Sequence, residues 1–181
     1  MCATLNGMPT LINDPAPPEI QRLIERRREL GQDRLDEVWE GVYVMNPAPH
    51  INHVDIQQAL AELLGPLARA RDLIPRIGEF NIGTAEDYRI PDGALMRPSE
   101  PGVYMPTAAL VIEIVSPGDD TWRKLPFYAE HHVDELLIIE PREHSVSWLA
   151  LTSDGRYEAV ERSALIDLGP AALASQLPWP A

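Results

Sequence analysis

Apolar and polar positions along the chain predict a sheet flanked by helices. Apolar residues recur at helical spacing over 52–70 and predict a long helix, which Pro66 should kink or shorten. A charge-rich helix is predicted over 18–30, because Pro18 suits a first helical turn and Gly31 ends the pattern. Two continuous apolar runs rich in β-branched residues, 108–115 and 136–139, predict buried strands.

Weaker patterns complete an α/β (α+β) fold with a central mixed sheet. Further strands are predicted over 36–45, 75–82, 88–96, 146–151 and 156–160, with breaks at Gly41, Gly78, Gly83 and Pro91–Gly93. A helix predicted over 121–132 joins the two buried strands, and such a crossover predicts a parallel pair at the sheet centre. Residues 1–17 are predicted to be an irregular lead-in, and 164–177 weakly structured or a short helix.

Length and composition predict one domain with its own core. At 181 residues with 45% hydrophobic residues, the chain needs neither disulfides nor a structural zinc. We expect an N-terminal arm and helix over 1–33, the main domain over 34–162 and a tail over 163–181. Neither a signal peptide nor an apolar run of about 18 residues is recognised, so no membrane span is expected. A single cysteine, Cys2, fits a reducing cytoplasm.

Charge adds two observations that point in different directions. A net charge of −13 argues against tight, non-specific binding to DNA, because neutralisation of phosphates by basic side chains supplies much of that affinity. Among the 15 basic residues there is a single lysine, Lys124, and all the others are arginines. Coding bias would explain the arginines, but a compact ammonium is not interchangeable with a guanidinium, so Lys124 is a candidate functional residue.

Glu113 interrupts the most apolar predicted strand of the chain. A carboxylate there is costly unless it is paired, hydrogen-bonded or bound to a metal, and it lies near the strand's C-terminal end, where sites of open α/β sheets form. Asp92, at the break of a preceding strand, offers a partner. Two carboxylates on adjacent strand ends can hold Mg²⁺. The alternatives are a solvent-facing or arginine-paired glutamate and an ordinary turn aspartate.

These residues occur in an ordered set of short motifs. The matching stretches are 36–42, 47–49 with His53 and Ile56, 78–81, 88–93, 111–117, 124–128, 133–135 and 138–141. In this order and spacing, over about residues 34–160, the chain resembles the Uma-type restriction endonuclease family, a former domain-of-unknown-function group of the PD-(D/E)XK nucleases. The superfamily's usual lysine position, two residues beyond the second acid, is Val115 here, so Lys124 must reach back from the following helix.

The resemblance implies a restriction-endonuclease-like core and a Mg²⁺-dependent phosphodiesterase, with Mn²⁺ as a substitute and DNA as the substrate. Asp92 and Glu113 would be metal ligands and catalytic residues, and Glu37 would complete the acidic site. Lys124 would orient the attacking water or stabilise charge on the phosphate. Dimerisation is implied as well, because many such nucleases cut duplexes as pairs.

Two more residues are candidates for substrate binding. His53, early in the long helix, would contact phosphate or a site carboxylate, although a structural role is common for such a histidine. Ser116, after the Glu113 strand, would donate to a site carboxylate or cap the turn. His50 and His53 have metal-like spacing, but no third nitrogen or sulfur ligand is near in sequence to favour zinc.

Three functions stay open at this stage. The first is a metal-dependent DNA endonuclease. The second is a catalytically degenerate protein with the same fold that acts as a protein-interaction module, which the acidic charge favours. The third is a nuclease acting on RNA or on a small nucleotide.

Overall fold

The computed structural model describes residues 9–13, 15–116 and 120–180, so Cys2 and most of the loop after Ser116 lie outside the described residues. Within the described ranges the strands form two six-stranded sheets. The first sheet contains, in spatial order, β1 (Thr10–Ile12), β3 (Val42–Met45), β2 (Glu37–Trp39), β6 (Tyr88–Arg89), β5 (Asn81–Gly83) and β8 (Tyr104–Met105). The second contains β12 (Tyr157–Ala159), β11 (Ser145–Leu151), β10 (Glu135–Glu140), β9 (Leu110–Ile114), β7 (Gly93–Met96) and β4 (Ile74–Ile77).

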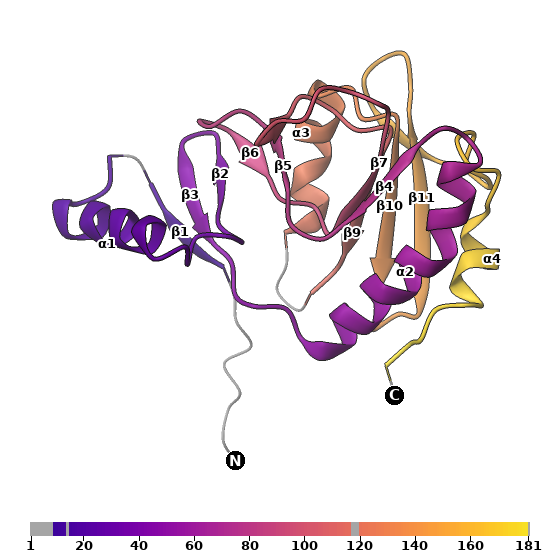
Figure 1. Cartoon of the computed structure of the whole chain (residues 1–181), viewed down its shortest axis with the longest axis horizontal. Coiled ribbons are helices and arrows are strands. Elements are labelled where there is room, and N and C mark those ends of the chain that lie inside the picture. Colours follow the sequence, from indigo (N-terminus) through magenta and orange to yellow (C-terminus); the bar gives the residue numbers. More distant parts are fainter. Residues whose placement is uncertain (1–8, 14, 117–119, 181) are drawn as a thin grey trace.

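Helices lie against the second sheet, and a further helix lies beside the first sheet (Figure 1). They are α1 (Pro18–Glu29), α2 (Ile51–Arg69), α3 (Leu125–Glu130), preceded by the 3₁₀ turn η1 (Thr121–Lys124), and α4 (Pro170–Ala174). Helix α1 lies at the end of the molecule away from the second sheet, together with β1 (Figure 1). The mixed α/β class predicted from the sequence is confirmed, with its strands divided between two sheets.

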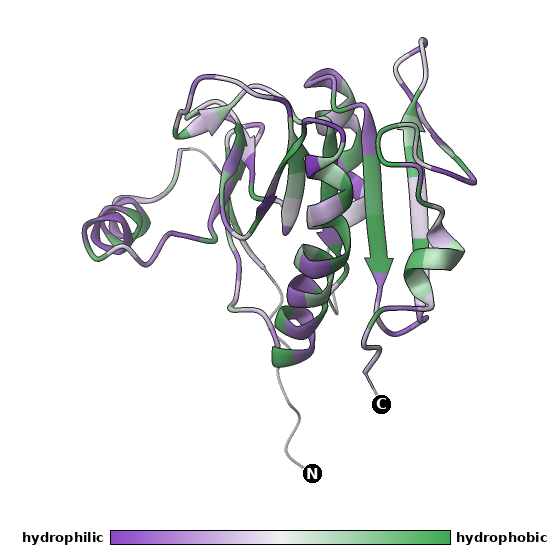
Figure 2. Ribbon diagram, turned by 45° about the vertical axis from the view of Figure 1, so that its right-hand side comes forward, coloured by the Kyte–Doolittle hydropathy of each residue, from purple (hydrophilic) through white to green (hydrophobic). Residues whose placement is uncertain are grey.

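The buried strands β9 and β10 form the parallel pair that the sequence predicts. Leu110 pairs with Glu135 and Ile114 with Ile139, and η1 with α3 makes the crossover. Both strands are buried because helices or strands cover each face, which explains their continuously apolar sequences. Figure 2 shows β10 as an almost unbroken hydrophobic strand beside α2, whose colours alternate between hydrophobic and hydrophilic.

Two predicted strands divide at their predicted breaks, and at each break the chain changes sheets, which was not predicted. The strand predicted over 75–82 divides at Gly78, whose φ of 120° turns the chain, into β4 and β5. The strand predicted over 88–96 divides around Pro91 into β6 and β7. Part of the predicted irregular lead-in is strand β1, paired antiparallel with β3. Short strands that change sheets carry little pattern of their own.

The second sheet separates two apolar clusters. One lies under α2 and α4 and includes Ile56, Leu60, Ile112, Trp148 and Leu173. The other lies under α3 and the first sheet and includes Ile82, Val111, Phe127, Tyr128 and Ile138. In the described ranges we find no helix long and apolar enough to cross a membrane.

Candidate metal and nuclease site

Strand alternation places the Glu113 carboxylate under α3. Ile112 and Ile114 belong to the cluster below α2, so Glu113 between them points to the opposite face of the sheet. There the side chain is almost fully buried, with 4% exposed. Its nearest functional groups therefore come from η1, α3 and the first sheet rather than from α2.

Lys124 meets two carboxylates at the end of η1. Its Nζ lies 3.1 Å from Oε1 of Glu37 and 3.3 Å from both carboxylate oxygens of Glu113. The lysine is 7% exposed, so its charge is removed from water and compensated by these carboxylates. The single lysine therefore reaches back from the crossover to the acid of β9, as the resemblance requires.

Asp92 lies beside Glu113 because β7 pairs antiparallel with β9. Gly93 faces Ile112 in this register, and the backbone N–H of Asp92 donates to Ile112 O at 3.1 Å. Asp92 Oδ2 accepts from the backbone N–H of Ile114 at 2.6 Å, and Oδ1 lies 2.9 Å from Nε2 of His53. These two contacts fix the carboxylate next to the end of β9.

Glu37 completes the acidic group from the first sheet. Its Oε1 accepts from the backbone N–H of Ile90 at 2.6 Å, and its Oε2 accepts from Nε1 of Trp39 at 2.8 Å. The carboxylate is 1% exposed and pairs with Lys124. The structure thus brings together Glu37, Asp92, Glu113 and Lys124, which lie up to 87 positions apart in the chain.

The two candidate substrate-binding residues have different surroundings. His53, on the first turn of α2, is buried against Asp92, and among the described residues its Nδ1 has no hydrogen-bond partner. It therefore positions a site carboxylate in this structure. Ser116 follows β9 and lines the same cavity as Asp92 and Glu113.

Two contributors to the site were not assigned to it from the sequence. Tyr128, one helical turn beyond Lys124, donates its hydroxyl to Glu113 Oε1 and is fully buried. Its spacing of four residues from Lys124 was the available signal, since both side chains then share a helix face. Trp39 is half-buried, donates its Nε1–H to Glu37 and lines the cavity.

Burial dominates the electrostatics of Glu113. Removal from water raises the pKa of this carboxyl to about 8, and Lys124 opposes the rise. The negative charges of Asp92 and Glu37 raise it further, while the Tyr128 hydroxyl lowers it. Burial also raises the pKa of Tyr128 well above 10, so its hydroxyl acts as a donor.

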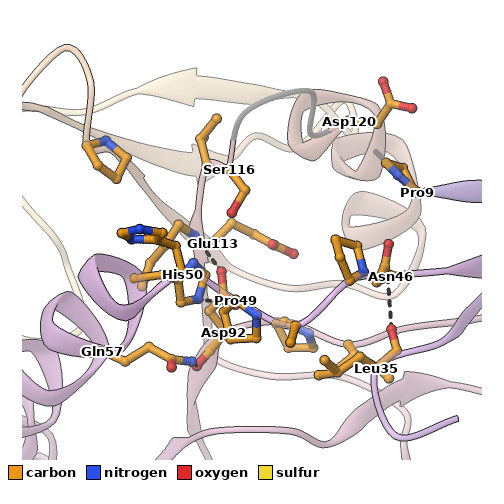
Figure 3. A pocket seen from close by; sticks show the side chains of 18 of the residues that line it. Pro9, Leu35, Asn46, Pro49, His50, Gln57, Asp92, Glu113, Ser116 and Asp120 are labelled. Carbon is orange, nitrogen blue, oxygen red and sulfur yellow. Dashed lines mark hydrogen bonds and ion pairs between the residues drawn. The ribbon is translucent and has the colours of Figure 1, made fainter. Parts of the chain in front are cut away.

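The group opens into a cavity of about 1030 Å³ between the two sheets. In Figure 3, Glu113 and Asp92 lie between Pro9, Leu35 and Asn46 on one side and His50 and Gln57 on the other. Glu37, His53, Ser116 and Lys124 also contribute to the lining. Within the described ranges, no three His, Cys, Asp or Glu side chains are arranged as a ready-made metal site.

The donor set nevertheless fits a hard divalent cation. Glu37, Asp92 and Glu113 carry three negative charges against one positive charge on Lys124, so two negative charges remain uncompensated if all are ionised. Mg²⁺ is commonly held by only one or two carboxylates and keeps several waters, so three protein side chains are not required. Asp92 and Glu113 are the pair that would hold it, because Glu37 is enclosed by Trp39, Ile90 and Lys124.

Comparison with known proteins identifies the family and the fold. The Uma2 family, described as "Putative restriction endonuclease", matches residues 18–177, and the chain belongs to this family. A solved structure, a putative nuclease belonging to DUF820 from Anabaena variabilis, is similar with a TM-score of 0.65 and 17% sequence identity. The match covers 80% of this chain and 92% of that one, and at this identity it shows the shared fold. No curated protein matches.

Proposed function

We propose that the protein is a Mg²⁺-dependent endonuclease that hydrolyses phosphodiester bonds of DNA, with Mn²⁺ able to replace Mg²⁺. The observation that carries this proposal is the meeting of Glu37, Asp92, Glu113 and Lys124 at one end of the cavity. A buried lysine between carboxylates beside a second acidic strand end is expensive to maintain. In a site that binds a cation and a phosphate, the carboxylates would bind the cation and the lysine would bind the phosphate.

The residues would divide the work of hydrolysis among them. Asp92 and Glu113 would hold the cation, which when bound supplies charge stabilisation and a more acidic water. Lys124 Nζ would orient the attacking water in line with the scissile P–O bond and would contact a non-bridging phosphate oxygen. A bond would form between the water oxygen and phosphorus while the bond to the leaving sugar oxygen breaks; the water would release a proton to solvent, and the leaving oxygen would take one up.

The remaining contacts would keep these groups in place. His53 and the backbone N–H of Ile114 fix Asp92, and the hydroxyl of Tyr128 fixes Glu113. Glu37 would hold Lys124 through its contact of 3.1 Å, so that the ammonium stays at the site when a cation occupies Glu113. These are positioning roles and involve no bond changes.

The acidic surface supports a second candidate function. A net charge of −13 opposes the approach of a nucleic-acid backbone, and it favours a catalytically degenerate relative that acts through a protein partner. The intact set of acids with its lysine favours the enzyme.

A cleavage assay separates the two functions. Supercoiled plasmid and labelled oligonucleotides are incubated with Mg²⁺, Mn²⁺ or EDTA, using wild type, Glu113→Gln and Lys124→Ala. We expect metal-dependent cleavage that each substitution slows roughly 100-fold, with Glu158→Gln on the exposed strand β12 as an unaffected control. Cleavage that survives EDTA or both site substitutions would contradict the enzyme proposal.

Two further expectations remain predictions. A homodimer and a cytoplasmic location follow from the family resemblance and from the single cysteine, respectively. Sedimentation velocity of the purified chain with and without DNA would decide the oligomeric state.

A further inference from the structure

The cavity has a mixed lining, and part of its wall is apolar. Around the acidic end it is built by side chains from β1, β2, β3, the loop before α2 and the turn after β10. The apolar lining residues include Pro9, Leu11, Leu35, Trp39, Val44, Pro47, Pro49, Ile90, Pro141 and Pro180. Such a surface matches the face of an unpaired base, since bases released from a duplex stack on apolar and aromatic side chains.

The charges around the cavity are unsuited to a duplex backbone. Among the described residues, its lining contains five carboxylates, from Glu37, Glu79, Asp92, Glu113 and Asp120, and two cationic side chains, from Lys124 and Arg142. Proteins that hold duplex DNA neutralise many phosphates along both strands with Lys and Arg. A duplex across this opening would bring several phosphates toward Glu79 and Asp120, whereas a single strand brings few.

The reacting groups also lie deep. Glu37, Glu113 and Lys124 are 1%, 4% and 7% exposed, so the scissile phosphate must enter the cavity to reach them. A strand without a partner can bend and insert one nucleotide. A duplex must first open and release a base, which costs stacking and pairing energy.

We propose that the substrate class of this site is single-stranded nucleic acid, with the scissile phosphate at Lys124 and an adjacent unpaired base against the apolar wall. The inference deepens the proposed nuclease function and rests on it. Leu11 lines the cavity and contributes an exposed part of this wall, with 54% of its surface accessible.

Matched substrates test the inference. The full chain is given one sequence as a single-stranded DNA, a single-stranded RNA, a blunt duplex and a single-stranded DNA with one abasic position, in Mn²⁺. Binding of the same labelled oligonucleotides is measured by anisotropy in Ca²⁺, which binds carboxylate oxygens. We expect single strands to be cut and bound at least about tenfold better than the duplex, and the abasic position to slow cutting about tenfold when it flanks the cut.

The outcomes separate this inference from the proposed function. Cutting of the duplex as fast as the single strand overturns the single-strand inference and leaves the nuclease proposal standing. Preferential binding of single strands with no cutting of any substrate supports the binding site and contradicts the nuclease. Equal binding of all four oligonucleotides overturns the inference irrespective of activity, and the DNA and RNA arms identify which single strand is preferred.

A variant pair links the preference to the wall. Leu11→Asn removes apolar surface from the cavity without changing charge, and Leu67→Asn makes the same change on an exposed position of α2 outside the lining. We expect Leu11→Asn to weaken single-strand binding roughly fivefold and Leu67→Asn to leave it unchanged. Equal effects of the two substitutions would overturn the assignment of this wall.

Discussion

The role of the Lys124 side chain depends on the two carboxylates that surround its ammonium group. It is the sole lysine of the chain, and it lies buried between Glu37 and Glu113. Replacing it leaves two buried carboxylates facing each other without a cation. Without bound metal, Lys124 therefore stabilises the fold, and with metal bound it is a proposed catalytic residue.

We predict that Lys124→Met lowers the free energy of unfolding by about 3 kcal/mol in EDTA, because removing one partner of a buried ion pair leaves uncompensated charge. Urea unfolding followed by circular dichroism measures it. The adjacent Arg123→Met is the control, since that side chain is 64% exposed and should change stability by about 0.5 kcal/mol or less. Equal stability of wild type and Lys124→Met would contradict the pairing described here.

At this scale the sequence predicted the candidate acids, the lysine and one supporting residue, His53, but not Tyr128 or Trp39. Glu113 was conspicuous because a charge in an apolar strand is rare, and Lys124 because the chain has no other lysine. Tyr128 and Trp39 look like ordinary core residues, and their contacts with Glu113 and Glu37 depend on how separate elements pack. The spacing of Tyr128 from Lys124 indicates a shared helix face but does not indicate the contact with Glu113.

Among the elements, the short strands carry the most demanding backbone. Gly83 ends β5 with a φ of 120°, and a Cβ there would lie 2.3 Å from Asp87 O. We predict that Gly83→Ala lowers stability by about 3 kcal/mol or more, because it adds a clash to an unfavourable φ. Gly155→Ala is the matched control, since its φ is 78° and no atom lies within 4 Å of the added Cβ, and about 1 kcal/mol is expected. Thermal unfolding measures the stability of both variants. Equal losses of stability in Gly83→Ala and Gly155→Ala would contradict the close packing at Gly83.

A buried glutamate ties the C-terminal segment to the second sheet. Glu135 of β10 accepts hydrogen bonds from Trp148 Nε1, Ser163 Oγ and the backbone N–H of Ala164, at 2.8, 2.6 and 2.8 Å. Beyond these contacts, Leu173 packs in the cluster below α2. The division at residue 162 into domain and tail stays a prediction, and these contacts show the segment packed against the sheet.

Glu135→Ala should therefore cost about 3 kcal/mol, because it leaves two buried donors, Trp148 Nε1 and Ser163 Oγ, and the part-buried N–H of Ala164 without their acceptor. Glu158→Ala on the exposed strand β12 should change stability by about 0.5 kcal/mol or less. Hydrogen exchange would report the same loss as faster exchange across 163–177. Unchanged protection there in Glu135→Ala would show that the segment is held by its apolar contacts alone.

Element boundaries were predictable where a pattern was long and uniform. Helix α2 and the strands β9, β10 and β11 follow their predicted ranges closely, since each buries a continuous face. The breaks between β4 and β5 and between β6 and β7 were predicted, but the change of sheet at each was not, because it occurs over a few residues that carry no pattern of their own. The proposed metal ligand Asp92 lies at one of these changes.

The whole molecule is acidic, and this limits how it can hold a nucleic acid. With a net charge of −13, we expect few phosphates to be neutralised in any complex. The logarithm of the binding constant for a single-stranded oligonucleotide in Ca²⁺ should fall with the logarithm of salt concentration at a slope of roughly −1 to −2. Anisotropy titrations between low and physiological salt measure the slope. A slope steeper than about −5 would contradict a cavity-centred complex and indicate an extended basic interface.

The central claim is that Asp92 and Glu113 form a metal site, and calorimetric titration of Mn²⁺ tests it most directly. The titration is made into wild type, Asp92→Ala, Glu113→Ala and, as a control from the same cavity, Asp120→Ala. We expect binding to wild type and Asp120→Ala and its loss from the two site variants, each confirmed as folded by circular dichroism. Absence of binding to wild type, or binding that both site variants retain, would contradict the claim.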